Sequence, residues 1–231
     1  MMGEYELKFT GPGYLVPMVR KYLTSICNMD PIYPKALVSS IYYDSIDFRF
    51  LAEKLNSDFL KTKYRVRWYS DADTHEPSDV AFLEAKFRIG TSRVKRRVEI
   101  ATSETKLFQQ SALTKSEFPD IAPLLSSAGI HAPNQIFPVF IVNYNRLRLL
   151  EPRSGSRISI DTDINVPKLN TCFIPKTPTT ALNTAVIEIK GKLDRIPEIL
   201  YPIVDMGFRK TSFSKYSACF EKLLAFSNGI N

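Results

Sequence analysis

Basic residues occupy every second position in one stretch within the first third of the chain. In residues 61–69, KTKYRVRWY, lysine or arginine stands at each odd position up to 67, and aromatic or aliphatic residues stand at the even positions from 64 to 68. Because successive side chains of a β-strand point to opposite faces, this pattern predicts a strand with one basic face and one apolar face. The apolar face requires a packed layer, and the basic face requires water or an anion.

Similar alternation marks at least five further segments. In each of them charged or polar residues lie two positions apart, so that in a strand they share one face. These shared positions are Glu4, Glu6 and Lys8; Glu84, Lys86 and Arg88; Arg93, Lys95, Arg97 and Glu99; Tyr144, Arg146 and Arg148; Arg157, Ser159, Asp161 and Asp163; and Glu188 and Lys190.

Two environments could account for these charged faces. The first is water on the open side of a half-buried sheet. The second is a shared interior, which is favoured because the faces are rich in Arg-x-Arg and Glu-x-Lys pairs rather than in the mixed polar residues of a solvated face. Arginine binds phosphate bidentately through its planar guanidinium group. We therefore expect a sheet that curls into a barrel, with charges lining the interior and apolar residues outside beneath helices.

The other segments complete an α+β pattern. Segments rich in β-branched and aromatic residues predict strands at 4–9, 37–43, 61–69, 80–88, 93–101, 137–149, 157–163 and 185–190. Helical periodicity appears at 14–24, 47–55, 104–113, 121–128, 196–206 and 214–226. Since there is no repeat and no convincing linker, residues 1–231 are predicted to form a single domain, built on an antiparallel barrel of about eight strands.

Composition narrows the class of ligand. The chain has 31 Lys and Arg against 24 Asp and Glu, a net charge of +7, which suggests an anionic partner such as nucleic acid, an acidic membrane surface or a phosphorylated small molecule. Cys27, Cys172 and Cys219 are far apart and form no CxxC motif, which argues against a disulfide framework or a zinc site. His75 and His131 lie in loop-like sequence with no assignable nucleophile, so a histidine-based catalytic triad is not expected.

Nothing in the sequence predicts a membrane anchor. The opening MMGEYELKF lacks the basic and apolar regions of a signal peptide. The longest stretch without a charged side chain, 121–145, contains three prolines and a glycine and does not read as a spanning helix. We expect a cytoplasmic protein, with membrane association only through a separate membrane protein as partner.

Eight short blocks resemble one known family in order along the chain. The family is the polyphosphate polymerase domain of the vacuolar transporter chaperone (VTC) proteins, within the triphosphate tunnel metalloenzyme or CYTH-like superfamily. Serine-lysine-tyrosine near the C-terminus is the most specific block, and together the blocks cover essentially the whole chain. They are EYELKF at 4–9, SSIYYD at 39–44, LAEKL at 51–55, KYRVRWY at 63–69, FLEAK at 82–86, YNR at 144–146, VIEIK at 186–190 and SFSKY at 212–216.

The resemblance implies a triphosphate-tunnel barrel that transfers the γ-phosphoryl group of ATP to the end of a polyphosphate chain. ATP and polyphosphate are the expected partners, Mn²⁺ or Mg²⁺ the expected cofactor, and no specific nucleic acid is expected. The residues that would take part in catalysis are Arg65, Arg67, Lys86, Arg146 and Lys215. Those that would bind substrate are Lys8, Lys95, Arg97, Tyr144, Lys190 and Ser214. The metal would be held by Glu188, Glu6 and Glu4.

Several alternatives stay open at this point. Water could replace the chain end as acceptor, which would make the protein a triphosphatase acting on inorganic or organic triphosphate. The basic excess could also serve a non-catalytic module that binds polyphosphate or RNA, although the interleaved carboxylates disfavour this. Glu84 could organise neighbouring cations or touch the metal, and Asp161 could pair with arginine or assist the metal.

Overall fold

The structure is a computed structural model that describes residues 5–90, 92–101, 121–131, 135–175, 177, 180–192 and 194–227. It has an α+β fold built on antiparallel strands, as the sequence predicts. The chain forms two compact units, each assembled from three separated segments. Unit 1 comprises Met1–Leu37, Tyr144–Ile164 and Ala181–Ser214, and unit 2 comprises Val38–Asn143, Asn165–Thr180 and Lys215–Asn231.

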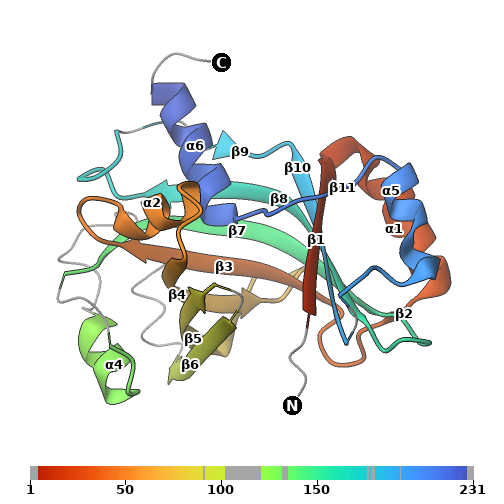
Figure 1. The fold of residues 1–231 in the computed structure, drawn as a ribbon, viewed down its shortest axis with the longest axis horizontal. Helices are drawn as coiled ribbons and strands as arrows, with labels where there is room; N and C mark the ends of the chain where they lie inside the picture. The colour runs from red at the N-terminus through yellow and green to blue at the C-terminus, as the bar shows by residue number, and fades with distance from the viewer. Residues whose placement is uncertain are drawn as a thin grey trace. The chain divides into compact units, whose positions relative to one another are not determined.

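The sheet of unit 1 follows the order β11-β1-β10-β8-β7, with β2 also paired to β7 (Figure 1). The pairings of β1 with β10 and β11 and of β10 with β8 are antiparallel, and β1 and β10 match residue for residue from Tyr5 opposite Gly191 to Pro12 opposite Thr184. Strands β7 and β8 begin or end in unit 2. The bounds are β1 Tyr5–Pro12, β2 Asn28–Met29, β7 Phe137–Leu150, β8 Arg157–Leu169, β10 Thr184–Gly191 and β11 Arg209–Lys210.

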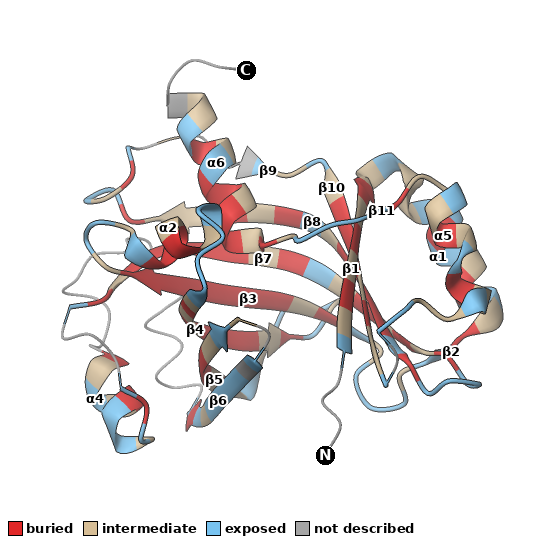
Figure 2. Ribbon diagram, in the orientation of Figure 1, coloured by how far each residue is buried: buried red, intermediate tan, exposed pale blue. Residues whose placement is uncertain are grey.

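One face of the unit 1 sheet carries the hydrophobic core. Phe9 and Ile187 from the strands pack with Leu23 of α1 (Val16–Ile26) and Ile203 of α5 (Pro202–Asp205). The two helices lie together beside β1 and β11, and their inner surfaces are buried (Figures 1 and 2). Alternation therefore leaves the second face of these strands to their charged residues.

The sheet of unit 2 follows the order β7-β3-β4-β5-β6. The pairings of β5 with β4 and with β6 are antiparallel, with one irregularity between Trp68 and Ser70. The small strand β9 pairs with β8. The bounds are β3 Lys35–Asp44, β4 Leu60–Ser70, β5 Pro77–Ile89, β6 Ser92–Ala101 and β9 Thr180–Ala181.

Two helices pack against the unit 2 sheet. Phe50 of α2 (Arg49–Leu55) meets Tyr64 edge to face, with ring centroids 5.2 Å apart, and so covers part of the apolar face of β4. Tyr216 of α6 (Lys215–Ser227) stacks on Tyr42 of β3 at 5.0 Å. A further short helix, α4, spans Ile121–Ser127.

The predicted strands are all present, most of them one to six residues longer than expected. The helix predicted at 196–206 is instead split into the 3-10 turn η2 (Glu198–Leu200) and α5, because Pro202 has no N–H to continue a helix and begins a new one. The helix predicted at 104–113 lies outside the described residues. Among the strands that the structure describes, the hydrogen-bonded order has two ends, β11 and β6, so closure into a barrel and the single-domain organisation stay predictions.

Among the helices of the described ranges, none is long and apolar enough to span a membrane.

Candidate functional site

The charged face of β4, β5 and β6 is ordered in rows that run across the strands. Strand pairing places Arg65 opposite Glu84 and Glu84 opposite Arg97. The next row on one side is Arg67, Phe82 and Glu99, and the next row on the other side is Lys63, Lys86 and Lys95. The sequence predicts the face of each residue, and the register adds which side chains are neighbours.

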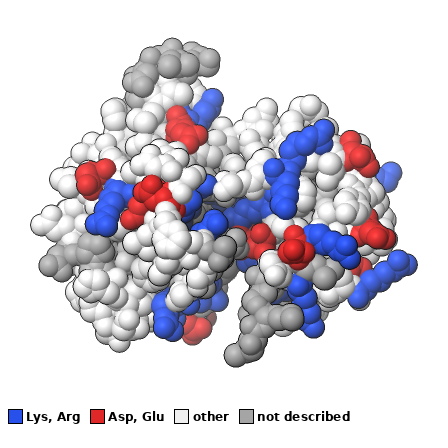
Figure 3. All heavy atoms as spheres, in the orientation of Figure 1, with Lys and Arg blue, Asp and Glu red and all other residues white. Residues whose placement is uncertain are grey.

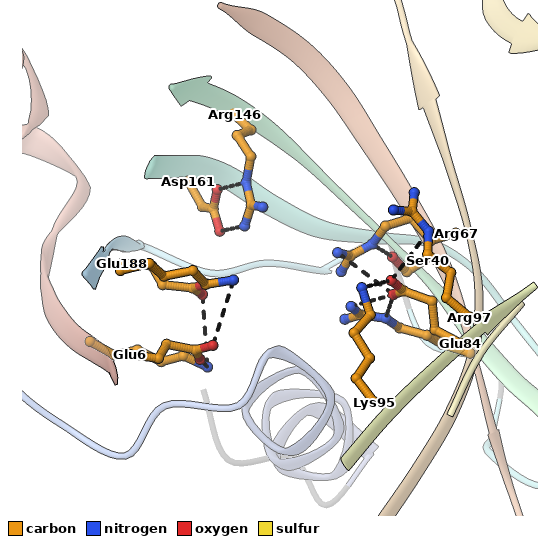
Figure 4. Close-up of polar contacts among 12 residues, drawn as sticks. Glu6, Ser40, Arg67, Glu84, Lys95, Arg97, Arg146, Asp161 and Glu188 are labelled. Carbon is orange, nitrogen blue, oxygen red and sulfur yellow. Dashed lines mark hydrogen bonds and ion pairs between the residues drawn. The ribbon is translucent and has the colours of Figure 1, made fainter. Parts of the chain in front are cut away.

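Glu84 is the centre of this face. Its side chain is 2% exposed, and its two oxygens contact four cations (Figure 4). Oε2 lies 2.5 Å from a terminal nitrogen of Arg65 and 3.9 Å from Arg67, while Oε1 lies 2.5 Å from Lys95 and 4.0 Å from Arg97. Of the two roles left open for Glu84, the structure therefore shows the organising one.

The ionisation of Glu84 follows from these contacts. Burial alone would raise its pKa, but Arg65, Arg67 and Lys95 together lower the pKa of Glu84 far below its ordinary value. The carboxylate stays charged, and it fixes the positions of side chains that would otherwise repel one another. In the resulting arrangement Lys95 and Arg97 remain about half exposed, at 46% and 40%.

The lysine row lies beside this cluster. Lys63 and Lys95 stand directly opposite Lys86 on the two neighbouring strands. Like charges directly opposite each other destabilise a sheet. A face that keeps three arginines around one carboxylate and three lysines in the adjoining row, of which Lys95 also contacts Glu84, is suited to a multivalent anion.

Arg67 connects this face to β3 and thereby to α6. Its Nε donates a hydrogen bond of 3.1 Å to the hydroxyl of Ser40. Tyr42, two positions further along β3, shares the face of Ser40 and stacks on Tyr216. The first turn of α6, which begins at Lys215, is therefore anchored on the same face of β3 that meets Arg67.

Unit 1 carries a second charged cluster on β1 and β10. Lys8 lies opposite Glu188, and Glu6 lies opposite Lys190. Each carboxylate contacts both lysines: Glu6 at 3.1 Å from Lys8 and 3.6 Å from Lys190, and Glu188 at 3.9 Å from Lys8 and 3.0 Å from Lys190. Acidic and basic side chains thus alternate around this group of four. Glu6 and Glu188 are labelled in Figure 4.

Arg146 and Asp161 form a bidentate pair in the same unit (Figure 4). The Arg146 Nε and a terminal nitrogen donate to the two Asp161 oxygens at 2.6 and 2.7 Å. Burial by itself would lower the pKa of Arg146, but Asp161 raises it well above its ordinary value. The guanidinium also lies 5.3 Å from the centre of the Tyr144 ring. Of the two roles left open for Asp161, the structure shows the pairing with arginine.

Two carboxylates of unit 1, Glu6 and Glu188, have the chemistry of a possible metal centre. Glu6 and Glu188 supply hard oxygen donors on neighbouring strands, which is the ligand chemistry of Mg²⁺ and Mn²⁺. Within the described ranges no group of three potential metal ligands occurs. The pair nevertheless fits a Mg²⁺-like ion, because such ions are commonly held by one or two carboxylates and completed by substrate phosphates.

The predicted site residues fall into two groups in the structure. The cluster in unit 1 contains Glu6, Lys8, Tyr144, Arg146, Glu188 and Lys190, and Ser214 also belongs to this unit. The cluster in unit 2 contains Arg65, Arg67, Lys86, Lys95 and Arg97, and Lys215 at the start of α6 also belongs to this unit. Glu4 lies outside the described residues. Their roles toward substrate and metal stay predictions.

Sequence reasoning missed two neighbours of these residues. Ser40 was assigned no role, and Phe82 was not recognised as a member of the charged face. The alternation Phe82, Glu84, Lys86 would have placed Phe82 there. No sequence signal connects Ser40 with Arg67, because the contact joins residues 27 positions apart on different strands.

Acidic and basic side chains stand interspersed over the face of the molecule seen in Figure 3. Glu84 and Asp161 are buried, so these two carboxylates contribute little to the acidic part of that surface. In the clusters around Glu84 and Asp161, a ligand would therefore meet mainly the arginine and lysine side chains.

Solved structures show where this fold occurs. The PH1819 protein of Pyrococcus horikoshii OT3 matches with a TM-score of 0.52 and 17% identity, over 94% of this chain and 99% of that protein, which shows a shared fold. The HpAC1 protein from Hippeastrum, in which a dominant triphosphatase activity is described, matches at a TM-score of 0.46 and 16% identity, over 98% of this chain and 96% of that one. No curated protein sequence matches the chain at a significant level.

The family assignment rests on the sequence as a whole. The model of the VTC domain matches residues 4–224, which includes every strand that bears the two charged clusters. The chain therefore belongs to the VTC domain family.

Proposed function

We propose that this protein is a metal-dependent polyphosphate polymerase, which transfers the γ-phosphoryl group of ATP to the end of a polyphosphate chain. The observation that carries the proposal is the arrangement around Glu84. One buried carboxylate contacts Arg65, Arg67, Arg97 and Lys95, and Lys95 belongs to a row of three lysines with Lys63 and Lys86. The family membership and this arrangement together support a phosphate chain as the ligand.

The chemistry needs positioned cations more than a protein nucleophile. In phosphoryl transfer the protein holds donor and acceptor in line and stabilises charge that spreads over the phosphate oxygens. Arg65 and Arg67 are pre-oriented for this by Glu84 and Ser40, and Arg146 by Asp161. Pre-orientation matters because cations that are already in place do not have to reorganise as the reaction proceeds.

The acceptor is the terminal phosphate of the chain, whose oxygen attacks the γ-phosphorus of ATP. The bond between the γ-phosphorus and its bridging oxygen breaks, so ADP leaves and the chain grows by one phosphate. Glu6 and Glu188 would hold a divalent ion, which supplies neutralisation of phosphate charge when it is bound. Lys8 and Lys190, which contact those carboxylates, would bind the neighbouring phosphate oxygens.

The test is an analysis of products. The purified protein is incubated with ATP and Mn²⁺, and the products are separated on a gel stained for polyphosphate while free orthophosphate is measured in parallel. The proposal predicts a ladder or smear of long polyphosphate with ADP. Orthophosphate without polyphosphate would establish a triphosphatase instead, and turnover of neither kind would leave only an anion-binding module.

Two substitutions in the same assay separate catalysis from binding. Glu188→Gln removes a negative charge beside Lys8 and Lys190, so ATP binding should be retained or tighter. Turnover should nevertheless fall by about two orders of magnitude, the scale of a lost electrostatic stabiliser. Arg67→Ala should weaken binding and turnover together.

The matched control is Glu198→Gln, an exposed glutamate in the same unit, which should leave both quantities unchanged. Normal turnover in Glu188→Gln, with unchanged metal dependence, would contradict the metal role of Glu188.

A further inference from the structure

Phe82 is an aromatic residue on a face otherwise built from charges. It lies on β5 two positions before Glu84 and shares the row of Arg67 and Glu99. Its ring is partly exposed rather than buried in the core. Tyr69 of β4 stands against it edge to face, with ring centroids 6.1 Å apart.

Arg97 covers one side of this ring. Its guanidinium carbon lies 3.3 Å from the centre of the Phe82 ring, well within the range of a cation–π contact. The Arg97 side chain is 40% exposed, so the guanidinium also presents a surface to its surroundings. The Arg97 guanidinium is therefore a platform backed by the Phe82 ring, which Tyr69 contacts edge to face.

We propose that this platform binds the nucleobase of a nucleoside triphosphate by stacking on the Arg97 guanidinium. The inference rests on the proposed function, since it concerns the donor whose phosphates would occupy the adjacent cations. Bases stack on arginine planes and on aromatic rings in proteins, and such stacking tolerates any base because every base has a π-face.

The order of the rows fits an extended nucleotide. From the row of Phe82 to the row of Lys86 is four residues along β5, about 13–14 Å at 3.3–3.4 Å per residue. Between them lies the row of Arg65, Glu84 and Arg97. A base at Phe82 thus directs its phosphates along the arginines toward the lysine row.

The same geometry sets the specificity. A base stacked on this platform meets the face of the guanidinium, and the guanidinium N–H donors lie in that plane and do not point at the base edge. ATP and GTP should therefore bind with similar affinity. Adenosine without phosphates should not displace inorganic tripolyphosphate, because a single stacking contact is weak compared with several phosphate contacts.

The experiment compares ATP with tripolyphosphate, which carries the phosphates without the base. Dissociation constants for ATP, GTP and tripolyphosphate are measured by calorimetry for the wild type and for Phe82→Leu, which keeps an apolar side chain but removes the ring. The ATP and GTP constants should rise about tenfold, within the range for a lost base stack. The tripolyphosphate constant should stay within about twofold of the wild type, because the arginines and lysines are retained.

Two further variants keep the result interpretable. Phe87→Leu makes the same change on the same strand but on the opposite face, where Phe87 meets Tyr64, and should alter none of the constants. Arg97→Lys keeps the charge without the planar surface, and should weaken ATP binding more than tripolyphosphate binding. This variant also carries the test if Phe82→Leu does not fold.

The outcomes separate the two proposals. A wild type that binds neither ATP nor tripolyphosphate would overturn the proposed function, and the base site with it. Binding of both ligands with equal losses in Phe82→Leu would show that Phe82 only supports the phosphate site, which would overturn the base site alone. No loss in either variant, or a strong preference between ATP and GTP, would also overturn it.

Discussion

Glu84 shows how one residue can set the geometry of a whole charged face. A carboxylate that is 2% exposed would be costly in isolation, and it is stabilised here by contacts with Arg65 and Lys95 at 2.5 Å. The same contacts hold the cations in fixed positions. Removing the carboxylate should therefore affect folding as well as ligand binding.

The pH dependence of unfolding tests this role of Glu84. Its pKa in the folded state lies below the value of about 4.5 that it has when unperturbed. The unfolded chain therefore takes up the proton first, and the stabilisation that is present above this pH is lost as the pH falls through and below it. Glu84→Gln should lower the free energy of unfolding at neutral pH by about 3 kcal/mol, because buried cations lose their partner.

The difference between wild type and variant should then shrink by about 2 kcal/mol as the pH is lowered to about 3. Urea unfolding at a series of pH values measures both quantities, with the exposed Glu76→Gln as the control. A difference that does not depend on pH would show that Glu84 is not ionised in the folded protein.

The residue scale also shows the limits of sequence reasoning. Alternation correctly assigned Arg65, Glu84 and Lys86 to one kind of face, because side-chain direction is a local property of a strand. It could not show that Glu84 meets four cations, since that depends on strand register. Register is set by the turns and by the irregularity near Trp68, neither of which the alternation records.

At the scale of elements, α6 is attached to β3 through Tyr216. The Tyr216 hydroxyl donates a hydrogen bond of 2.8 Å to Oδ2 of Asp44, and both side chains are buried. Asp44 also accepts bonds from the backbone N–H groups of Phe50 and Leu51, so one carboxylate joins β3, α2 and α6. Burial raises the pKa of Asp44 despite these bonds, which makes each donor important for its charged form.

Loss of the Tyr216 hydroxyl should loosen this attachment. Tyr216→Phe should reduce the free energy of unfolding by about 2 kcal/mol, the cost of removing a buried hydrogen bond to a charged group. Because Lys215 precedes Tyr216 directly, tripolyphosphate binding should weaken as well. Thermal unfolding and calorimetry measure the two effects, and the half-exposed Tyr201→Phe should change neither. Unchanged stability in Tyr216→Phe would show that the packing of Tyr216 on Tyr42 alone fixes α6.

The elements themselves were predicted where periodicity is strong. The segment from Leu60 to Ala101 has a two-residue period that no helix could satisfy. The strands predicted there agree closely with the observed bounds of β4, β5 and β6. The prediction of one helix at 196–206 was wrong at its centre, because it relied on the helical spacing of the apolar residues and did not allow for a new helix starting at Pro202. The two-residue strands β2, β9 and β11 are too short to show any period.

At the scale of the whole molecule, anion binding requires that the net charge of +7 be concentrated where an anion can reach it. Each unit contributes one cluster in which buried carboxylates fix the cations: Glu84 in unit 2 and Asp161 in unit 1. The VTC domain model spans both. Several arginine and lysine contacts to a multivalent anion should make binding strongly dependent on ionic strength.

The most direct measurement is the affinity for inorganic tripolyphosphate at two salt concentrations. Calorimetric titration at about 0.1 M and about 1 M salt, where the screening lengths are about 10 Å and 3 Å, tests the phosphate site without any assumption about turnover. The account predicts binding that weakens at least tenfold at the higher salt and is displaced by ATP but not by adenosine. Binding that is absent at low salt, or that does not change between the two concentrations, would contradict it.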